Sequence, residues 1–190
     1  MNRKSRVTPA WPLLALDPGT ESTAFCHWDP DKKKVIATGI KPNDEVVELL
    51  VKMKKDNPHQ VLVVEMIKSY GNALGDSVLE TCVWIGRFIA AWGKWGQVER
   101  LPRKTIVTHL CNNPRANDSN VRQELINRFG GKEKAIGKKK TPGPLYKLRG
   151  DMWAALAVAI TYQELCNLEN KGVPTYLSQK QEVWHATRRT

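Results

Sequence analysis

Two short aliphatic runs, each ending in an acid, constrain this chain more than any other feature. Residues 13–16 (Leu-Leu-Ala-Leu) are followed by Asp17, and residues 61–64 (Val-Leu-Val-Val) are followed by Glu65. An unbroken apolar run of this length is typical of a strand that is covered on both faces of a sheet. If the two strands lie side by side, their carboxyl ends bring both acids to one edge, where open α/β sheets bind ligands.

Asp17 is followed at once by a Pro-Gly turn, so the apolar strand stops at a charged group. One interpretation is a strand that ends in a solvated turn. The other is a metal or phosphate site, because a carboxylate that loses water needs a cation or several hydrogen-bond donors. The second interpretation requires further acids, and Glu65 and Asp151 are the candidates.

The remaining pattern predicts one α/β domain over residues 12–166, after a basic N-terminal arm over 1–11 and before a C-terminal extension over 167–190. Asn43 is expected to cap the first helix. Besides the two acid-ended strands, strands are expected at 21–28, 33–40 and 97–101, and helices at 43–57, 73–94, 103–110, 120–129 and 152–166.

The long helix expected at 73–94 carries more apolar surface than one buried face requires. Its predicted seam packs either on the sheet or on a twin helix in a homodimer. Trp84, Phe88 and Trp95 lie off this seam, which favours the homodimer. The seam consists of Leu74, Val78, Cys82, Ile85, Ile89 and Trp92.

A formal net charge of +11 points to a polyanionic partner, although a basic protein with no such partner has the same composition. The excess is densest over residues 132–149, where Gly and Pro are expected to prevent regular folding. This segment is interpreted as a flexible phosphate-gripping loop or, alternatively, as a solvated basic loop. Its basic candidates are Lys138, Lys139, Lys140, Lys147 and Arg149.

The four cysteines show neither a C-x-x-C pair nor a neighbouring histidine at ligand spacing, so a zinc site is not expected and reduced thiols are. The first ten residues lack the apolar core of a signal peptide. No run reaches the roughly 20 apolar residues of a membrane span. A cytoplasmic protein without membrane contact is therefore expected.

The order of these parts resembles the RuvC-type Holliday-junction resolvases of the ribonuclease H-like superfamily. The likeness runs over residues 13–162 and rests on Leu-Asp17-Pro-Gly-Thr, the strand meander, Val-Val-Glu65, the long helix, Pro-Arg, and Asp151-x-x-Ala-Ala-Leu-Ala-Val-Ala-Ile. The basic loop and the tail suggest a phage or prophage branch, which would act in the host-cell cytoplasm. The resemblance implies a mixed five-stranded sheet flanked by helices on both faces, and a homodimer.

The resemblance also implies an endonuclease that nicks Holliday junctions or related branched DNA (a fork or a flap) with two Mg²⁺ or Mn²⁺ ions per active site. Asp17 would bridge the ions, while Glu65 and Asp151 would each ligate one. The family usually has a fourth acid at the position of Ala154. Asp76 and Asp118 are weaker substitutes, because a loop or a helix cap explains each of them.

Implied DNA contacts are Lys68, Tyr70, Arg103 and Lys104, in addition to the basic loop. The family's aromatic wedge position holds Lys68, which leaves Tyr70 as the nearest aromatic. Two rival functions remain open. Sugar kinases and actin-like ATPases share the opening motif but need a second domain, and a non-catalytic or inactivated branched-DNA-binding protein would tolerate Ala154.

Overall fold

The computed structural model describes residues 12–71, 73–93 and 97–179. The basic arm expected at 1–11, Trp95 and the end of the C-terminal extension lie outside the described residues.

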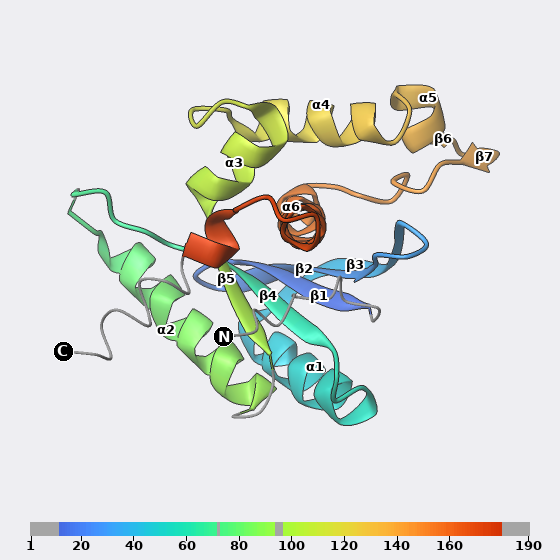
Figure 1. The fold of residues 1–190 in the computed structure, drawn as a ribbon. Helices are drawn as coiled ribbons and strands as arrows, with labels where there is room; N and C mark the ends of the chain where they lie inside the picture. The colour runs from blue at the N-terminus through green and yellow to red at the C-terminus, as the bar shows by residue number, and fades with distance from the viewer. Residues whose placement is uncertain (1–11, 72, 94–96, 180–190) are drawn as a thin grey trace.

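A mixed five-stranded sheet forms the centre of the molecule, as the sequence predicted (Figure 1). Its strand order is β3-β2-β1-β4-β5. β1 pairs with β2, and β2 with β3, in antiparallel fashion, whereas β1–β4 and β4–β5 are parallel. The strands are β1 (Leu13–Pro18), β2 (Ser22–Asp29), β3 (Lys34–Pro42), β4 (Val61–Met66) and β5 (Val98–Pro102).

Helices cover both faces of this sheet (Figure 1). α1 (Asn43–Asp56) and α2 (Asp76–Trp92) lie on one face, and α3 (Arg103–Cys111), α4 (Asp118–Arg128) and α6 (Met152–Asn170) lie on the other. Both faces of β1 and of β4 are buried, which explains the unbroken aliphatic runs of these two strands. None of the described helices combines the length and the apolar composition needed to cross a membrane.

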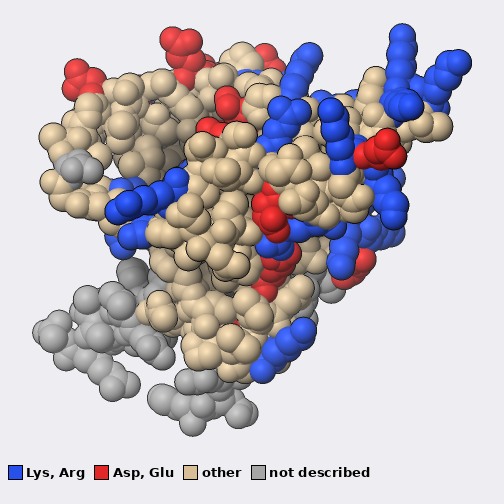
Figure 2. Space-filling model, turned by 90° about the horizontal axis from the view of Figure 1, so that it is seen from above, with Lys and Arg blue, Asp and Glu red and all other residues tan. Residues whose placement is uncertain are grey.

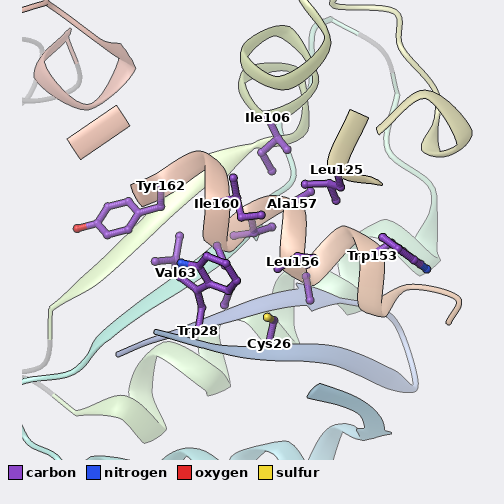
Figure 3. Close-up of a cluster of buried hydrophobic side chains, with 14 of the residues drawn as sticks. Cys26, Trp28, Val63, Ile106, Leu125, Trp153, Leu156, Ala157, Ile160 and Tyr162 are labelled. Carbon is purple, nitrogen blue, oxygen red and sulfur yellow. The ribbon is translucent and has the colours of Figure 1, made fainter. Parts of the chain in front are cut away.

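α6 is the central helix of its layer and packs directly on β1, β2 and β4. Ala155, Ala157 and Ala159 are fully buried, so the helix backbone lies close to the sheet. Figure 3 shows Leu156, Ala157 and Ile160 of this helix above Cys26, Trp28 and Val63 of the strands. The helix begins where predicted but continues past Cys166 to Asn170.

The buried face of α2 differs from the predicted seam. Thr81, Ile85, Phe88 and Trp92 are buried, whereas Leu74 lies before the helix and is 41% exposed. The predicted seam is therefore wrong at its N-terminal end and at Phe88. Spacing alone did not distinguish two neighbouring apolar stripes, and the bulkiest side chains determined which stripe faces the sheet.

The basic segment folds more regularly than predicted. It contains α5 (Lys132–Ala135) and a two-stranded hairpin of β6 (Gly137–Lys138) and β7 (Thr141–Pro142). A Cβ at Gly143 would lie 2.3 Å from the carbonyl oxygen of Lys134, so only glycine permits this close approach. Buried Leu145 anchors the base, which leaves Lys138, Lys139 and Lys140 exposed at the tip.

Asn43 fixes the turn that follows β1, although it does not cap α1 as predicted. Pro42 is the N-cap, and no side chain caps this end. The buried Asn43 amide instead donates to the carbonyl oxygens of Gly19 (3.0 Å) and Thr20 (3.1 Å), and its Oδ1 accepts from Thr23 Oγ1 (2.6 Å). A single side chain therefore holds the turn through which the backbone leaves Asp17.

Replacing this amide should cost more stability than its apolar volume suggests. Asn43→Leu leaves two carbonyls and a buried hydroxyl without partners, so we expect a loss of about 2–4 kcal/mol in the free energy of unfolding. Urea denaturation measures it. Asn127→Ala, at an exposed position on α4, is the control and should change stability by less than about 0.5 kcal/mol. Equal effects of the two substitutions would contradict this role of Asn43.

Candidate active site

Three acids from three separate elements line one cavity of about 550 Å³. Asp17 is the second-to-last residue of β1, and Glu65 is the second-to-last residue of β4. Leu16 and Val64 are partners in the parallel β1–β4 register, so the acids that follow them are neighbours. Asp151 belongs to the helical layer that packs on the sheet, where it is the N-cap residue of α6. The cavity is also lined by Arg103, Asp118, Ser119, Val121, Arg122, Gly150, Trp153 and Ala154.

Burial raises the pKa values of the two strand-end acids, and repulsion from neighbouring carboxylates adds to each shift. The pKa of Asp17 rises from its ordinary value of 3.8 to about 8, chiefly because the group is desolvated and further because Glu65 and Asp151 lie nearby. Desolvation also raises the pKa of Glu65, although Arg103 opposes this shift. Strong perturbation of acids in a cavity is typical of functional sites, and here its main physical cause is desolvation, to which the neighbouring acids add.

Arg103 lies among the acids and is the cation that partly compensates them. Its Nη1 is 3.6 Å from Glu65 Oε2, a distance that allows an ion pair but is too long for a hydrogen bond. Its Nη2 donates to Asp118 Oδ1. Glu65 Oε2 is consequently buried without a hydrogen-bond partner in the described structure. Such an oxygen is costly unless a further group reaches it.

The donor set suits a hard divalent cation, which prefers carboxylate oxygens. Asp17, Glu65 and Asp151 offer only oxygen ligands, and a cation would relieve the repulsion that raises the pKa of Asp17. As the side chains stand, however, no three His, Cys, Asp or Glu residues of the described chain are close enough together to hold one ion. Ion binding therefore requires side-chain movement, with Arg103 the nearest obstacle.

The position at which the family resemblance implies a fourth acid is occupied by Ala154, which lies in the wall of the cavity. Ala154 lines the cavity one helical turn into α6 and contributes only a methyl group. Asp118 also lines the cavity, from the first turn of α4, with its side chain 88% exposed. Asp76 begins α2 and is not among the lining residues. Of the two weaker candidates, only Asp118 is near the site.

Lys68, Tyr70 and Lys104 come together beside the acidic cavity. They line a second hollow of about 420 Å³, which also includes Tyr176 of the C-terminal extension. The Nζ atoms of Lys68 and Lys104 lie 5.6 Å and 5.3 Å from the centroid of the Tyr70 ring. Arg103 lies in the acidic cavity instead, one residue from Lys104. The start of α3 therefore separates the two hollows.

The other predicted basic residues lie at the far side of the acidic cavity. Lys147 and Arg149 line a groove of about 920 Å³ along the edge strand β3, together with Ile36 and Tyr146. Lys138, Lys139 and Lys140 project from the hairpin. Figure 2 shows many Lys and Arg side chains at this end of the face, with a few acidic side chains among them and others near the middle and at the opposite edge.

Arg122, Ser119 and Trp153 line the acidic cavity and were not predicted from the sequence. Asn117 caps α4 in a reciprocal capping box with Asn120, which places Asp118 and Ser119 in the first turn. Asp118 and Arg122 are four residues apart and share a helix face. That spacing was visible in the sequence, but nothing in it indicated that this face opposes the N-terminus of α6.

The sheet order, the two helical layers and the acids at the strand ends define a RuvC-type, ribonuclease H-like fold. Among solved structures, the chain is similar to Thermus thermophilus RuvC, with TM-score 0.61, 12% identity, and coverage of 84% of this chain and 98% of that one. RuvC of the same organism in complex with a Holliday junction substrate gives TM-score 0.62, 12% identity, and coverage of 84% and 96%. The yeast mitochondrial Holliday junction resolvase Ydc2 gives TM-score 0.51, 14% identity, and coverage of 90% of each chain.

These structural similarities are not accompanied by a match in the two other comparisons. No model of a known protein family matches the chain, and no curated protein matches it. At 12–14% identity the likeness establishes the fold, and the chemistry must be argued from the residues of the cavity.

The raised pKa of Asp17 predicts an unusual pH dependence of stability in the metal-free protein. Between about pH 4 and pH 8, folded Asp17 retains a proton that unfolded Asp17 releases, so stability should fall as pH rises. Asp17→Asn removes this contribution. The free energy of unfolding of the variant should exceed that of the parent by roughly 2–4 kcal/mol near pH 8, and the two should be equal near pH 4. Urea unfolding in EDTA tests this, with exposed Asp56→Asn as the control; a pH-independent difference would contradict it.

Proposed function

We propose that this protein is a metal-dependent endonuclease that nicks branched DNA. The observation that carries the proposal is the cavity in which Asp17, Glu65 and Asp151 converge, with a buried Glu65 oxygen that lacks a hydrogen-bond partner in the described structure. The RuvC-type fold supports it, because one of the similar structures is RuvC in complex with a Holliday junction substrate. A Holliday junction, fork or flap is the proposed class of substrate.

Asp17, Glu65 and Asp151 would hold the ions, with Asp17 placed between the other two acids. Two Mg²⁺ or Mn²⁺ ions bound there would supply an activated water and stabilise charge on the attacking and leaving oxygens. Asp17 must lose its proton before it can act as a ligand, because burial keeps its pKa near 8. Arg103 would have to release Glu65, and its guanidinium would then be available to a DNA phosphate.

The basic residues around the cavity would bind the arms of the DNA. Lys68, Tyr70 and Lys104 form one side, and Lys147, Arg149 and the hairpin lysines form the other. Phosphate contacts of this kind position a duplex without reading its sequence. The protein would therefore grip DNA with groups that are distinct from the acids that hold the metal.

A second function is favoured by one specific observation. Ala154 leaves the carboxylate wall one acid short, and Arg103 engages Asp118, the nearest alternative. A protein that binds branched DNA without cutting it would fit this arrangement. Cleavage assays distinguish the two functions.

Removing one proposed metal ligand should abolish cleavage while binding persists. Asp17→Asn and Glu65→Gln are each expected to slow Mn²⁺-dependent nicking of a labelled four-way junction by about 100-fold or more, because several kcal/mol of charge stabilisation is lost. Affinity for the junction should change only a few-fold. Denaturing gels measure the nicks, and electrophoretic mobility shift measures binding.

Asp56→Asn, on the opposite face of the sheet, is the matched control and should cut like the parent. Parental rates in Asp17→Asn would remove the assignment of the site. Junction binding by the parent without nicks, in either Mg²⁺ or Mn²⁺, would instead support the non-catalytic alternative.

We also propose a homodimer formed through the outer face of α2. Leu79 and Val83 are 51% and 50% exposed, and Gly86 and Ala90 continue the same exposed stripe at spacings of three and four residues. Small residues in such a stripe allow close helix contact. Figure 1 shows α2 on the side of the sheet opposite α6.

A charge on this stripe should separate the two subunits. Val83→Glu would place two like charges at the proposed interface, so we expect dimerisation to weaken at least tenfold, or by about 1.4 kcal/mol. Sedimentation velocity at low micromolar concentration measures the change. Val51→Glu on α1, where the valine is 53% exposed, adds the same charge elsewhere and should leave the mass unchanged. A monomeric parent would rule out the dimer.

A further inference from the structure

Arg122 is a cation in the acidic cavity with no acidic partner among the described residues. Its neighbour Arg103 contacts Glu65 and Asp118, whereas no carboxylate of the described chain forms an ion pair with Arg122. The Arg122 guanidinium lies over the Trp153 ring, with Cζ 5.0 Å from the ring centroid. Stacking on an indole orients a guanidinium while leaving its N–H edge available to a ligand.

Trp153 adds an unused hydrogen-bond donor at the same place. The residue is only 6% exposed, and its Nε1 is buried without a partner in the described structure. Figure 3 shows Trp153 at the edge of the hydrophobic cluster, with its ring nitrogen at the end that points away from Leu156. A buried donor without an acceptor is unfavourable, so an acceptor supplied by a ligand would satisfy it.

The surroundings favour a phosphate over a nucleobase as that acceptor. The guanidinium already covers the Trp153 ring, so this ring offers no free face for base stacking. An arginine fork matches two oxygens of one phosphate group. Ser119 lines the cavity from the first turn of α4 and brings a hydroxyl to the same wall.

We infer that Arg122 and the indole N–H of Trp153 bind one phosphodiester of the DNA strand. This phosphodiester is next to the one that would be cleaved at the three acids. This inference deepens the proposed function, because it takes the ligand of the cavity to be DNA. Arg122 would be a positioning residue: it fixes the strand in register with the acids and carries no proton or metal. It would also supply positive charge to a cavity that otherwise repels its substrate.

A scan with neutral linkages tests this pairing of one side chain with one phosphate. A branched DNA is prepared with a single methylphosphonate at each position around the branch point, and its affinity is compared with that of the unmodified DNA. All proteins carry Glu65→Gln so that the DNA remains intact. At one linkage the modification should weaken binding roughly tenfold when Arg122 is present, as for loss of a charge-assisted hydrogen bond. With Arg122→Ala the modification at the same linkage should weaken binding less than about twofold.

The matched control is Arg87→Ala. Arg87 stacks on Trp84 at 4.5 Å in the same manner, but on α2 and outside the cavity. Each ratio compares two DNAs with one protein, so a general loss of affinity cancels. Arg122→Gln is the second variant if Arg122→Ala does not fold. Trp153→Phe removes the indole N–H but keeps an aromatic ring, and it should reduce the ratio of affinities for unmodified and modified DNA at the same linkage.

An identical linkage profile in the parent and in both Arg122 variants would overturn the inference, as would an equal loss with Arg87→Ala. Failure of the proposed nuclease function is recognised separately, because the protein with native Glu65 would then leave all branched DNA uncut. In that case the linkage scan still decides whether Arg122 contacts a phosphate.

Discussion

The parallel pairing of β1 with β4 forces two carboxylates into adjacent, largely buried positions, and the rest of the structure depends on this constraint. Leu16 and Val64 are register partners, so Asp17 and Glu65 cannot separate without disrupting the centre of the sheet. Burial raises the pKa of Asp17 to about 8, with Glu65 and Asp151 adding to the shift. The unfavourable interaction is maintained by the packing of the sheet, because Leu16 and Val64 beside the two acids are fully buried.

α6 connects this strained edge to the helices that complete the cavity. Its N-terminus carries Asp151 and Trp153. Nearer its C-terminus, Glu164 accepts hydrogen bonds from His109 of α3 at 2.7 Å and from Arg128 of α4 at 2.6 Å, in the tautomer that places a proton on His109 Nε2. Burial alone would raise the pKa of Glu164, but these two partners lower it. α3 and α4 are therefore fixed to α6, and with them Arg103 and Arg122.

The sequence was sufficient for the sheet and for the three acids, because strand runs and their terminal charges are local signals. The buried face of α2 and the fold of residues 132–149 were not predictable in this way. Phe88 faces the core because of its tertiary partners, and the hairpin depends on a backbone contact at Gly143 that composition does not reveal. The same reasoning explains why Arg122 and Trp153 were missed. Each has an ordinary helical context, and only the packing of α4 against α6 brings them together.

The charge distribution resolves an apparent conflict between an acidic cavity and a polyanionic substrate. The protein carries a formal net charge of +11, so long-range attraction would favour the proposed DNA substrate even though the acids of the cavity would repel it. Lysines of the hairpin and of the Tyr70 hollow act at a distance, where exposed charges are screened within about a Debye length of roughly 8–10 Å. Among the described residues that line the cavity, only Arg103 and Arg122 carry a positive charge. Arg103 already contacts two carboxylates, Glu65 and Asp118. In the proposed binding mode, entry of a phosphate would therefore depend most directly on Arg122.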